Sequence, residues 1–201
     1  MRRLIMKMSM SLDGFVGTET GELDWVFKSS DPQSKGWTLN LVNKAGLHIM
    51  GRTSFHSMAT YWPISKDAFA APMNEIPKAT FTRKGFKDFD RKKVASLSPA
   101  GATWAEARVF EGDLTENIRK LKQEPGKPIL AHGGAEFMRN LIQTGLIDEY
   151  NLAIHPVVLG KGLPIFTGIA KPFHLILVDE KSFPGGVVVH TYQPAENANQ
   201  F

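Results

Sequence analysis

Residues 128–137, Pro-Ile-Leu-Ala-His-Gly-Gly-Ala-Glu-Phe, change within a few positions from a strand pattern to a helix pattern. The short apolar run that ends at His132 is typical of a buried strand. The pair Gly133-Gly134 follows, and then apolar residues recur at helical spacing: Phe137, Met138, Leu141 and Ile142. A buried strand followed directly by an amphipathic helix is the repeating unit of an α/β protein.

The same alternation extends in both directions from this segment. Strands are predicted at 4–10, 47–50, 78–82, 150–158, 173–179 and 187–192. Helices are predicted at 33–45, at 54–59, from Asp113 to the residues before Pro125, and from Gly134 to Gly145. The polar stretch 84–104 is weakly patterned and is predicted to hold one short strand. This order predicts a mostly parallel sheet flanked by helices, finished by an antiparallel hairpin at Pro184-Gly185-Gly186.

Length and composition favour one globular domain. The chain has 201 residues, of which 42% are hydrophobic and 22% charged. We expect a single domain over residues 1–194 and a loose tail over 195–201. Since no apolar run approaches the roughly 18 residues that span a membrane, and no signal-peptide core is present, the cytoplasm is the expected location.

The residue inventory excludes several kinds of chemistry. The chain has no cysteine, which excludes disulfides, thiolate metal sites and a cysteine nucleophile. Its six histidines show no ligand spacing, so no metal site is expected. The net charge is +4, and the basic residues are scattered, so nucleic-acid binding is not expected. A pocket for a phosphorylated small molecule fits this mild excess better.

Two strand-to-helix junctions could bind an anion. Gly51-Arg52-Thr53 opens one helix and Gly133-Gly134 opens another. Free N–H groups at a helix N-terminus and the helix dipole favour a phosphate there, and arginine adds a bidentate donor. Glycines at such turns also occur for steric reasons alone, so each junction keeps that second explanation. A third glycine-punctuated loop, 11–17, carries Asp13, which either faces a ligand or forms a turn with Gly14.

Taken together, the ordered motifs resemble one known superfamily. Three of the motifs each follow a predicted strand: Ser-Leu-Asp-Gly-Phe-Val-Gly at 11–17, Gly-Arg-Thr at 51–53 and Gly-Gly-Ala-Glu-Phe at 133–137. The fourth is Pro-Val-Val-Leu-Gly-Lys-Gly-Leu-Pro-Ile-Phe at 156–166. They resemble the dihydrofolate reductase-like superfamily, and more closely the C-terminal reductase domain of bifunctional riboflavin-biosynthesis deaminase-reductases. The resemblance covers about residues 2–193.

The resemblance implies an NADPH-dependent reductase. By motif position, the cofactor phosphates would be held by Gly51, Arg52, Thr53, Gly133, Gly134, Ala135, Glu136 and Phe137. The loop that meets the adenosine 2′-phosphate would hold Thr82, Arg83 and Lys84. The loop beside the nicotinamide would hold Asp13, Gly14, Phe15 and Gly17, with Asp13 as the residue that orients the substrate or relays a proton.

Two departures from the family pattern limit the choice of substrate. Dihydrofolate reductases carry a carboxylate on the first long helix, whereas residues 33–45 contain no Asp or Glu. The deaminase half of the riboflavin enzyme is absent, because its cysteines are absent. A stand-alone reductase acting on a small heterocyclic or ribosylated substrate is therefore the expected function. The alternatives are a dihydrofolate reductase and a cofactor-binding protein without catalysis.

The sequence also predicts which residues contact the substrate and how the chain assembles. The substrate site is predicted to use Trp25, Phe55, Trp62 and Lys161, with Trp37 and Tyr61 as further aromatic residues that could instead belong to the core. The strands at 150–158, 173–179 and 187–192 are largely apolar on both faces and need cover on both. A homodimer through these strands is expected, as relatives often form; the competing arrangement folds residues 160–172 back over them.

Overall fold

A computed structural model describes residues 1–195 of the chain, so residues 196–201 of the expected tail lie outside the described residues. Its strands are β1 Leu4–Ser11, β2 Leu47–Gly51, β3 Lys78–Phe81, β4 Arg108–Phe110, β5 Ile129–His132, β6 Glu149–His155, β7 Leu175–Ser182 and β8 Val188–Pro194. They form one sheet in the order β4-β3-β2-β5-β1-β6-β8-β7. The first six run parallel, and β8 and β7 are antiparallel. The predicted sheet is thus confirmed.

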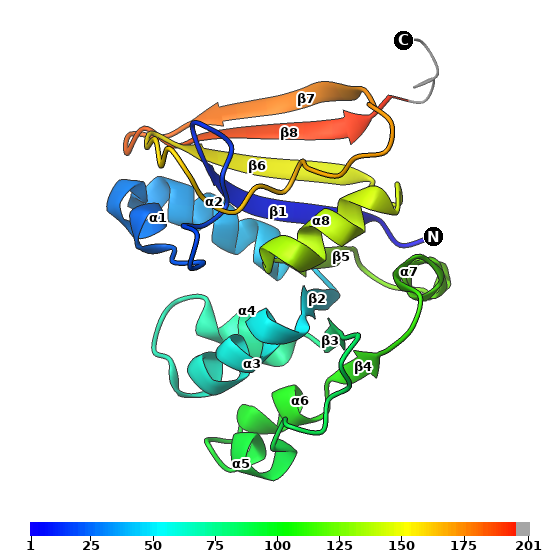
Figure 1. Ribbon diagram of the computed structural model, residues 1–201. Helices are drawn as coiled ribbons and strands as arrows, with labels where there is room; N and C mark the ends of the chain where they lie inside the picture. The colour runs from blue at the N-terminus through cyan, green and yellow to red at the C-terminus, as the bar shows by residue number, and fades with distance from the viewer. Residues whose placement is uncertain (196–201) are drawn as a thin grey trace.

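Helices cover both faces of the sheet (Figure 1). They are α1 Asp24–Ser29, α2 Pro32–Asn43, α3 Arg52–Tyr61, the 3-10 turn η1 Trp62–Ile64, α4 Ala70–Glu75, α5 Arg91–Ala95, α6 Gly101–Ala105, α7 Leu114–Gln123 and α8 Ala135–Gln143. Helices α7 and α8 pack on one face and α2 to α6 on the other, as two hydrophobic clusters show. Within the described part of the chain, none of the helices has the length and apolar character that crossing a bilayer requires.

The alternation of side chains along β1 separates an apolar face from a partly polar one. Leu4, Met6 and Met8 point into the cluster under α7 and α8. Ile5 points to the opposite face, where it packs with α2. Lys7 and Ser9 share this second face, because successive strand residues alternate. The central strand therefore places two polar residues on the side covered by α1 and α2.

The stretch 84–104 was predicted wrongly. It contains no strand; it forms α5 and α6, and the short strand β4 follows at Arg108. Val94 and Trp104 anchor these two helices in the second hydrophobic cluster. Each helix is only five residues long, which is too short for helical periodicity to appear in the sequence.

The C-terminal strands receive most of their cover from the same chain. Segment 163–173 crosses one face of β6 and β8, with Ile165 fully buried and Phe173 packed against the core (Figure 1). On the opposite face, Trp37 of α2 packs against Val187 and Val189. The competing arrangement for residues 160–172 is therefore present, and only β7 remains largely exposed.

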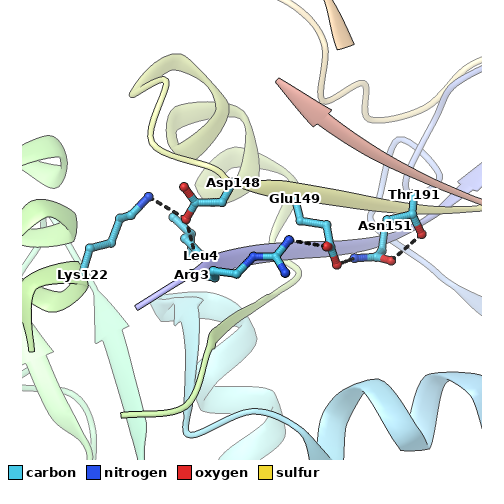
Figure 2. A network of polar contacts seen from close by, with 7 residues as sticks. All are labelled: Arg3, Leu4, Lys122, Asp148, Glu149, Asn151 and Thr191. Atoms are coloured by element: carbon cyan, nitrogen blue, oxygen red, sulfur yellow. Dashed lines mark hydrogen bonds and ion pairs between the residues drawn. The ribbon is translucent and has the colours of Figure 1, made fainter. Parts of the chain in front are cut away.

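A chain of polar side chains connects β1, β6 and β8 where parallel pairing gives way to antiparallel pairing (Figure 2). Arg3 donates to Glu149 at 2.6 Å, and Asn151 donates to the other oxygen of Glu149 at 2.9 Å. Thr191 of β8 donates to the Asn151 amide oxygen at 2.9 Å, and both residues are buried. Because a buried polar group without a partner is costly, this chain favours one register of β6 against β8.

A second polar contact holds the end of α7 against the starts of β1 and β6 (Figure 2). Asp148, just before β6, accepts a hydrogen bond from the Leu4 backbone N–H at 2.7 Å. The same carboxylate oxygen accepts from the Lys122 ammonium at 2.6 Å. Lys122 is buried and also donates to the Leu146 carbonyl at 2.7 Å. The end of α7 is thereby fixed to the start of β1 and β6.

Candidate active site

Four loops meet at one edge of the sheet because of the strand order. Strands β3, β2, β5 and β1 are consecutive neighbours and all run parallel, so their carboxyl ends lie side by side. The loops that follow them are 82–86, the junction at Gly51, the junction at Gly133-Gly134, and 12–17. In open α/β sheets, ligands bind at this edge. The structure thus brings the four predicted cofactor segments together.

Two of the junction glycines allow close packing within the protein. A Cβ on Gly51 would lie 2.7 Å from the Phe137 Cβ, so glycine permits the close approach of α8 to β2. A Cβ on Gly134 would lie 3.0 Å from the Ser54 Oγ, and its φ of 87° also favours glycine. These two glycines and Phe137 therefore have a packing role, whether or not a ligand binds.

Gly133 differs from its neighbours because it borders open space. Its φ is 24°, and a Cβ built on it would meet no atom within 4 Å. It lies at the carboxyl end of β5, directly before the N-terminus of α8. Space at a glycine backbone in front of a helix N-terminus can admit a ligand phosphate.

Each arginine at this edge pairs with a carboxylate. Arg52, the first residue of α3, donates to Asp88, and this hydrogen bond lowers the pKa of the Asp88 carboxyl. Arg83, in the loop after β3, donates to Glu136 in the first turn of α8. The Arg52 Nε atom is buried and has no hydrogen-bond partner. The site therefore holds a buried donor that has no partner among the described residues.

The other residues predicted around the phosphates have simpler surroundings. The Thr82 hydroxyl accepts from the Lys84 N–H at 3.1 Å and donates to the Gly85 carbonyl at 3.0 Å, which closes a turn. Lys84 and Thr53 are exposed, and Ala135 is the first residue of α8. The turn made by Thr82 sets the direction in which Arg83 and Lys84 leave β3.

The loop after β1 is attached to the segment after β6. Val16 N–H donates to the Leu163 carbonyl at 2.9 Å, and Leu163 N–H donates to the Gly17 carbonyl at 2.9 Å. A Cβ on Gly162 would lie 2.3 Å from the Gly17 oxygen, so the two backbones touch. Phe15 forms an isolated bridge with Pro164. In this arrangement the loop 12–17 forms a fixed wall at the end of β1.

Asp13 belongs to this attachment. Its carboxylate accepts hydrogen bonds from the backbone N–H of Leu159 at 3.1 Å and of Gly160 at 2.7 Å. A hydrogen bond from Ser11, followed by these two backbone donors, lowers the pKa of the Asp13 carboxyl. A carboxylate stabilised in its charged form holds no proton near neutral pH, so Asp13 is a poor proton donor there. Its position supports an orienting role for the loop.

A strip of basic and polar side chains lies on the α1 and α2 side of the sheet. Lys7 of β1 is half-buried, its Nζ atom lies 3.1 Å from the Ser9 Oγ atom, and burial lowers its pKa to about 8. Its neighbour in β5 is His132, whose pKa burial lowers to about 3, helped by the positive charge of Lys7. His155, at the end of β6, has its pKa lowered to about 4 in the same way. The strip thus combines one titratable ammonium with neutral imidazoles.

The polar partners of these histidines are also within the protein. His132 Nε2 lies 3.0 Å from His48 Nδ1, and His155 Nδ1 lies 2.7 Å from the Ser29 Oγ atom. The sequence shows no ligand spacing among the histidines. Lys7 was missed, although a lysine that interrupts an apolar strand is a visible signal. Among the described residues, no group of three or more His, Asp or Glu could hold a metal ion.

The predicted substrate residues are not brought together. Trp25 of α1 packs edge-on against His155 at 5.4 Å between ring centroids, which places it beside the polar strip. Phe55 is fully buried among Phe89 and other aromatic residues of the second cluster, so it cannot line a site. Trp62 is half-buried against the same cluster. Lys161 is exposed and pairs with Glu19 at 2.7 Å.

The two further aromatic residues, Trp37 and Tyr61, differ in their burial. Trp37 packs in the third hydrophobic cluster, as a core residue does. Tyr61, at the end of α3, is exposed and contacts Trp62 edge-on. Trp25 thus contacts the polar strip, whereas Trp62 packs against the second cluster.

Helix α2 carries no carboxylate that could hold a cationic heterocycle. The nearest acidic residue, Asp31, caps the helix by accepting from the N–H groups of Gln33 at 2.7 Å and Ser34 at 3.1 Å. Its second oxygen accepts from the Gly185 N–H at 2.9 Å. These donors keep the pKa of the Asp31 carboxyl below its usual range despite the opposing effect of burial. Asp31 is therefore occupied by the fold itself.

These features define a class of protein: a dihydrofolate reductase-like α/β fold with glycine junctions at the carboxyl edge of its parallel strands. More narrowly, residues 2–189 match the model of the RibD C-terminal domain, and the chain belongs to this family. It is 33% identical over 192 residues to the uncharacterized protein YyaP of Bacillus subtilis (strain 168), a match that covers 95% of this chain and 94% of that protein.

Two solved structures show the same fold at low sequence identity. One is the diaminohydroxyphosphoribosylaminopyrimidine deaminase/5-amino-6-(5-phosphoribosylamino)uracil reductase of Thermotoga maritima, with a TM-score of 0.68, 16% identity, and coverage of 96% of this chain and 57% of that chain. The other is dihydrofolate reductase of Enterococcus faecalis complexed with NADP(H), with a TM-score of 0.58, 14% identity, and coverage of 96% and 97%. The resemblance predicted from the motifs is confirmed.

Proposed function

We propose that the protein is an NADPH-dependent reductase that transfers hydride to a small heterocyclic or ribosylated substrate. The observation that carries this proposal is the convergence of Gly51, Arg52, Arg83 and Gly133 at one edge of four parallel strands. Membership of the RibD C-terminal domain family supports it. A relative of the same fold is named as a reductase of 5-amino-6-(5-phosphoribosylamino)uracil, which makes that ribosylamino-pyrimidine the first compound to test.

The residues at this edge fit a dinucleotide. Gly133 leaves space in front of α8, and the buried Arg52 Nε lacks a partner. These two groups would hold the pyrophosphate, and Arg83 with Lys84 would hold the adenosine 2′-phosphate. When bound, NADPH supplies the hydride, and the protein supplies orientation and a proton source.

Lys7 is the residue best placed to act on the substrate. It is half-buried on the strip beside His132, and its pKa of about 8 leaves the ammonium protonated at neutral pH yet able to release a proton. In the proposed mechanism, the Lys7 ammonium binds the substrate and donates the proton that completes the reduction. Asp13 has the subordinate role of fixing the loop 12–17 against Leu159 and Gly160.

Cofactor titration tests the proposal. Arg83→Ala should weaken NADPH binding by about 1–3 kcal/mol, the scale of a charge-assisted hydrogen bond, and leave NADH nearly unchanged. Calorimetric titration of both cofactors measures the difference, followed by turnover tests on dihydrofolate and on the ribosylamino-pyrimidine. An equal loss for both cofactors would contradict the 2′-phosphate role of Arg83. Turnover of dihydrofolate would contradict the argument against a folate substrate, which rests on the absence of Asp and Glu from α2.

We also propose a homodimer through β7. Among the strands of the described residues, β7 is at the edge of the sheet and pairs only with β8. Its Ile176, Leu177 and Val178 side chains are each about half exposed. Beside it lies an apolar groove of about 500 Å³ whose lining includes Phe166 and Leu175. An exposed apolar edge strand next to an apolar groove is a favourable surface for a second copy of the chain.

A further inference from the structure

The ion pair between Arg83 and Glu136 connects two segments that are far apart in the sequence. Arg83 follows β3, and Glu136 lies in the first turn of α8, which follows β5. Strand β2 lies between β3 and β5 in the sheet. The pair therefore crosses the carboxyl end of β2, close to Arg52 and Gly133, which would hold the pyrophosphate. Both side chains are largely exposed, at 75% and 70%, so water and ligands can reach them.

We propose that Glu136 is a specificity-determining residue that competes with the 2′-phosphate of NADPH for Arg83. This proposal rests on the proposed function. In the free protein, the Glu136 carboxylate occupies the guanidinium that the 2′-phosphate would take. The Arg83 Nη2 atom that donates to Glu136 belongs to the fork of N–H donors that would bind the phosphate, so the two anions compete for it.

The competition acts on NADPH and spares NADH. A cofactor with the 2′-phosphate must first separate Arg83 from Glu136, and the released carboxylate then lies close to a phosphate of the same sign. A cofactor with a 2′-hydroxyl leaves the ion pair intact. Glu136 therefore reduces the advantage that Arg83 and Lys84 give to NADPH. The effect is modest, because an exposed ion pair contributes at most about 1 kcal/mol, which corresponds to about a fivefold change in affinity.

The test compares the Kd values of NADPH and NADH for the full chain and for Glu136→Gln, measured by calorimetry at fixed ionic strength. The variant should bind NADPH about two- to fivefold more tightly and NADH with unchanged affinity. In an Arg83→Ala background, the same substitution should tighten NADPH less, because the shared partner is gone. The double-mutant comparison isolates the effect that passes through Arg83.

Glu116→Gln is the matched control. Glu116 is also an exposed glutamate in the first turn of a helix and pairs with a cation, Lys120, at 2.7 Å. This variant removes the same charge from α7 and should leave both Kd values unchanged. Equal tightening of NADPH and NADH by Glu136→Gln, or no tightening beyond that of Glu116→Gln, would overturn the proposal while the proposed function stands. If the wild-type chain binds neither cofactor, the proposed function and the proposed role of Glu136 are both rejected.

Discussion

Lys7 shows how one side chain in an apolar strand can give a site its chemistry. Leu4, Met6 and Met8 fill the opposite face of β1, so Lys7 is not needed for the core. Within residues 1–195, its ammonium makes a single hydrogen bond, to Ser9 at 3.1 Å. A partly buried ammonium with so few partners costs stability. Such a cost is typical of a functional residue, which agrees with the proton-donor role proposed for Lys7.

The pH dependence of activity tests this role. Burial lowers the pKa of Lys7 to about 8, so kcat/KM should fall as pH rises through about 8, where the ammonium is lost. Lys7→Arg keeps the charge at all accessible pH values and should remove this limb from the profile. Lys7→Met should lower kcat/KM below about pH 8, and the difference from the wild type should shrink above it, whereas the exposed control Lys120→Met should change kcat/KM at no pH. A wild-type profile that stays flat from pH 6 to 10 would exclude Lys7 as the donor.

At the scale of elements, the β5–α8 junction provides a direct test of the cofactor site. Gly134→Val would place a side chain against Ser54, so loss of binding in that variant could reflect misfolding. Gly133→Ala directs a methyl group into open space instead, and should weaken NADPH and NADH alike by about tenfold or more because both contain the pyrophosphate.

A matched glycine controls for backbone strain in this experiment. Gly145, just after α8 at its other end, also has a positive φ, 66°, and open space at its Cβ position. Gly145→Ala should lower the free energy of unfolding by about 1 kcal/mol, as should Gly133→Ala, but it should leave both Kd values unchanged. Normal cofactor binding by a folded Gly133→Ala variant would remove this junction from the site.

Strand β3 begins with a lysine that links stability to pH. Lys78 is buried, donates to the Asn74 carbonyl at 2.5 Å and to Thr103 at 2.9 Å, and lies over the Trp104 ring. Burial lowers its pKa to about 7 from the usual 10.5. Between these values the unfolded chain binds more protons than the folded one, so this group makes the protein more stable as pH rises from 7 to 10.5.

Urea unfolding at pH 7 and pH 9.5 measures this linkage. The wild-type free energy of unfolding should increase between the two pH values relative to that of Lys78→Met, which has no titrating group at this position. The comparison subtracts the contributions of Lys7 and the other titrating groups, since both proteins share them. Parallel changes in the two proteins would show that Lys78 keeps its ordinary pKa in the folded state.

At the scale of the whole molecule, assembly depends on the face of β7 that the chain does not cover. We expect light scattering at micromolar concentration to give a mass about twice the 22.3 kDa of one chain. Val178→Lys places a charge on the exposed strand and should give the single-chain mass. Val158→Lys changes an apolar residue that is also exposed, at 65%, but lies outside the C-terminal strands, and should leave the dimer intact. A wild-type mass near 22.3 kDa would reject the dimer.

Much of the fold could be predicted because it depends on local patterns. The apolar run before Gly133, the helical spacing from Phe137 to Ile142, and the capping residues at Asp113 are all signals within a few neighbouring positions, and the structure has β5, α8 and α7 there. The order of the glycine motifs was sufficient to indicate the family. Helices α5 and α6 escaped prediction because five residues are too few to reveal a period.

The partners of the site residues were decided by tertiary structure. Asp13 meets Leu159 across 146 positions of the chain, and Arg83 meets Glu136 across 53. Lys7 lies beside His132 because β1 inserts between β5 and β6, a strand order that no local pattern contains. Phe55 has the helical spacing of a pocket residue as much as that of a core residue, and the tertiary packing of Phe86, Phe89 and Trp104 around it buries it. Local propensity and periodicity depend only on residues that are close in sequence. These contacts depend instead on which strands become neighbours when the sheet forms.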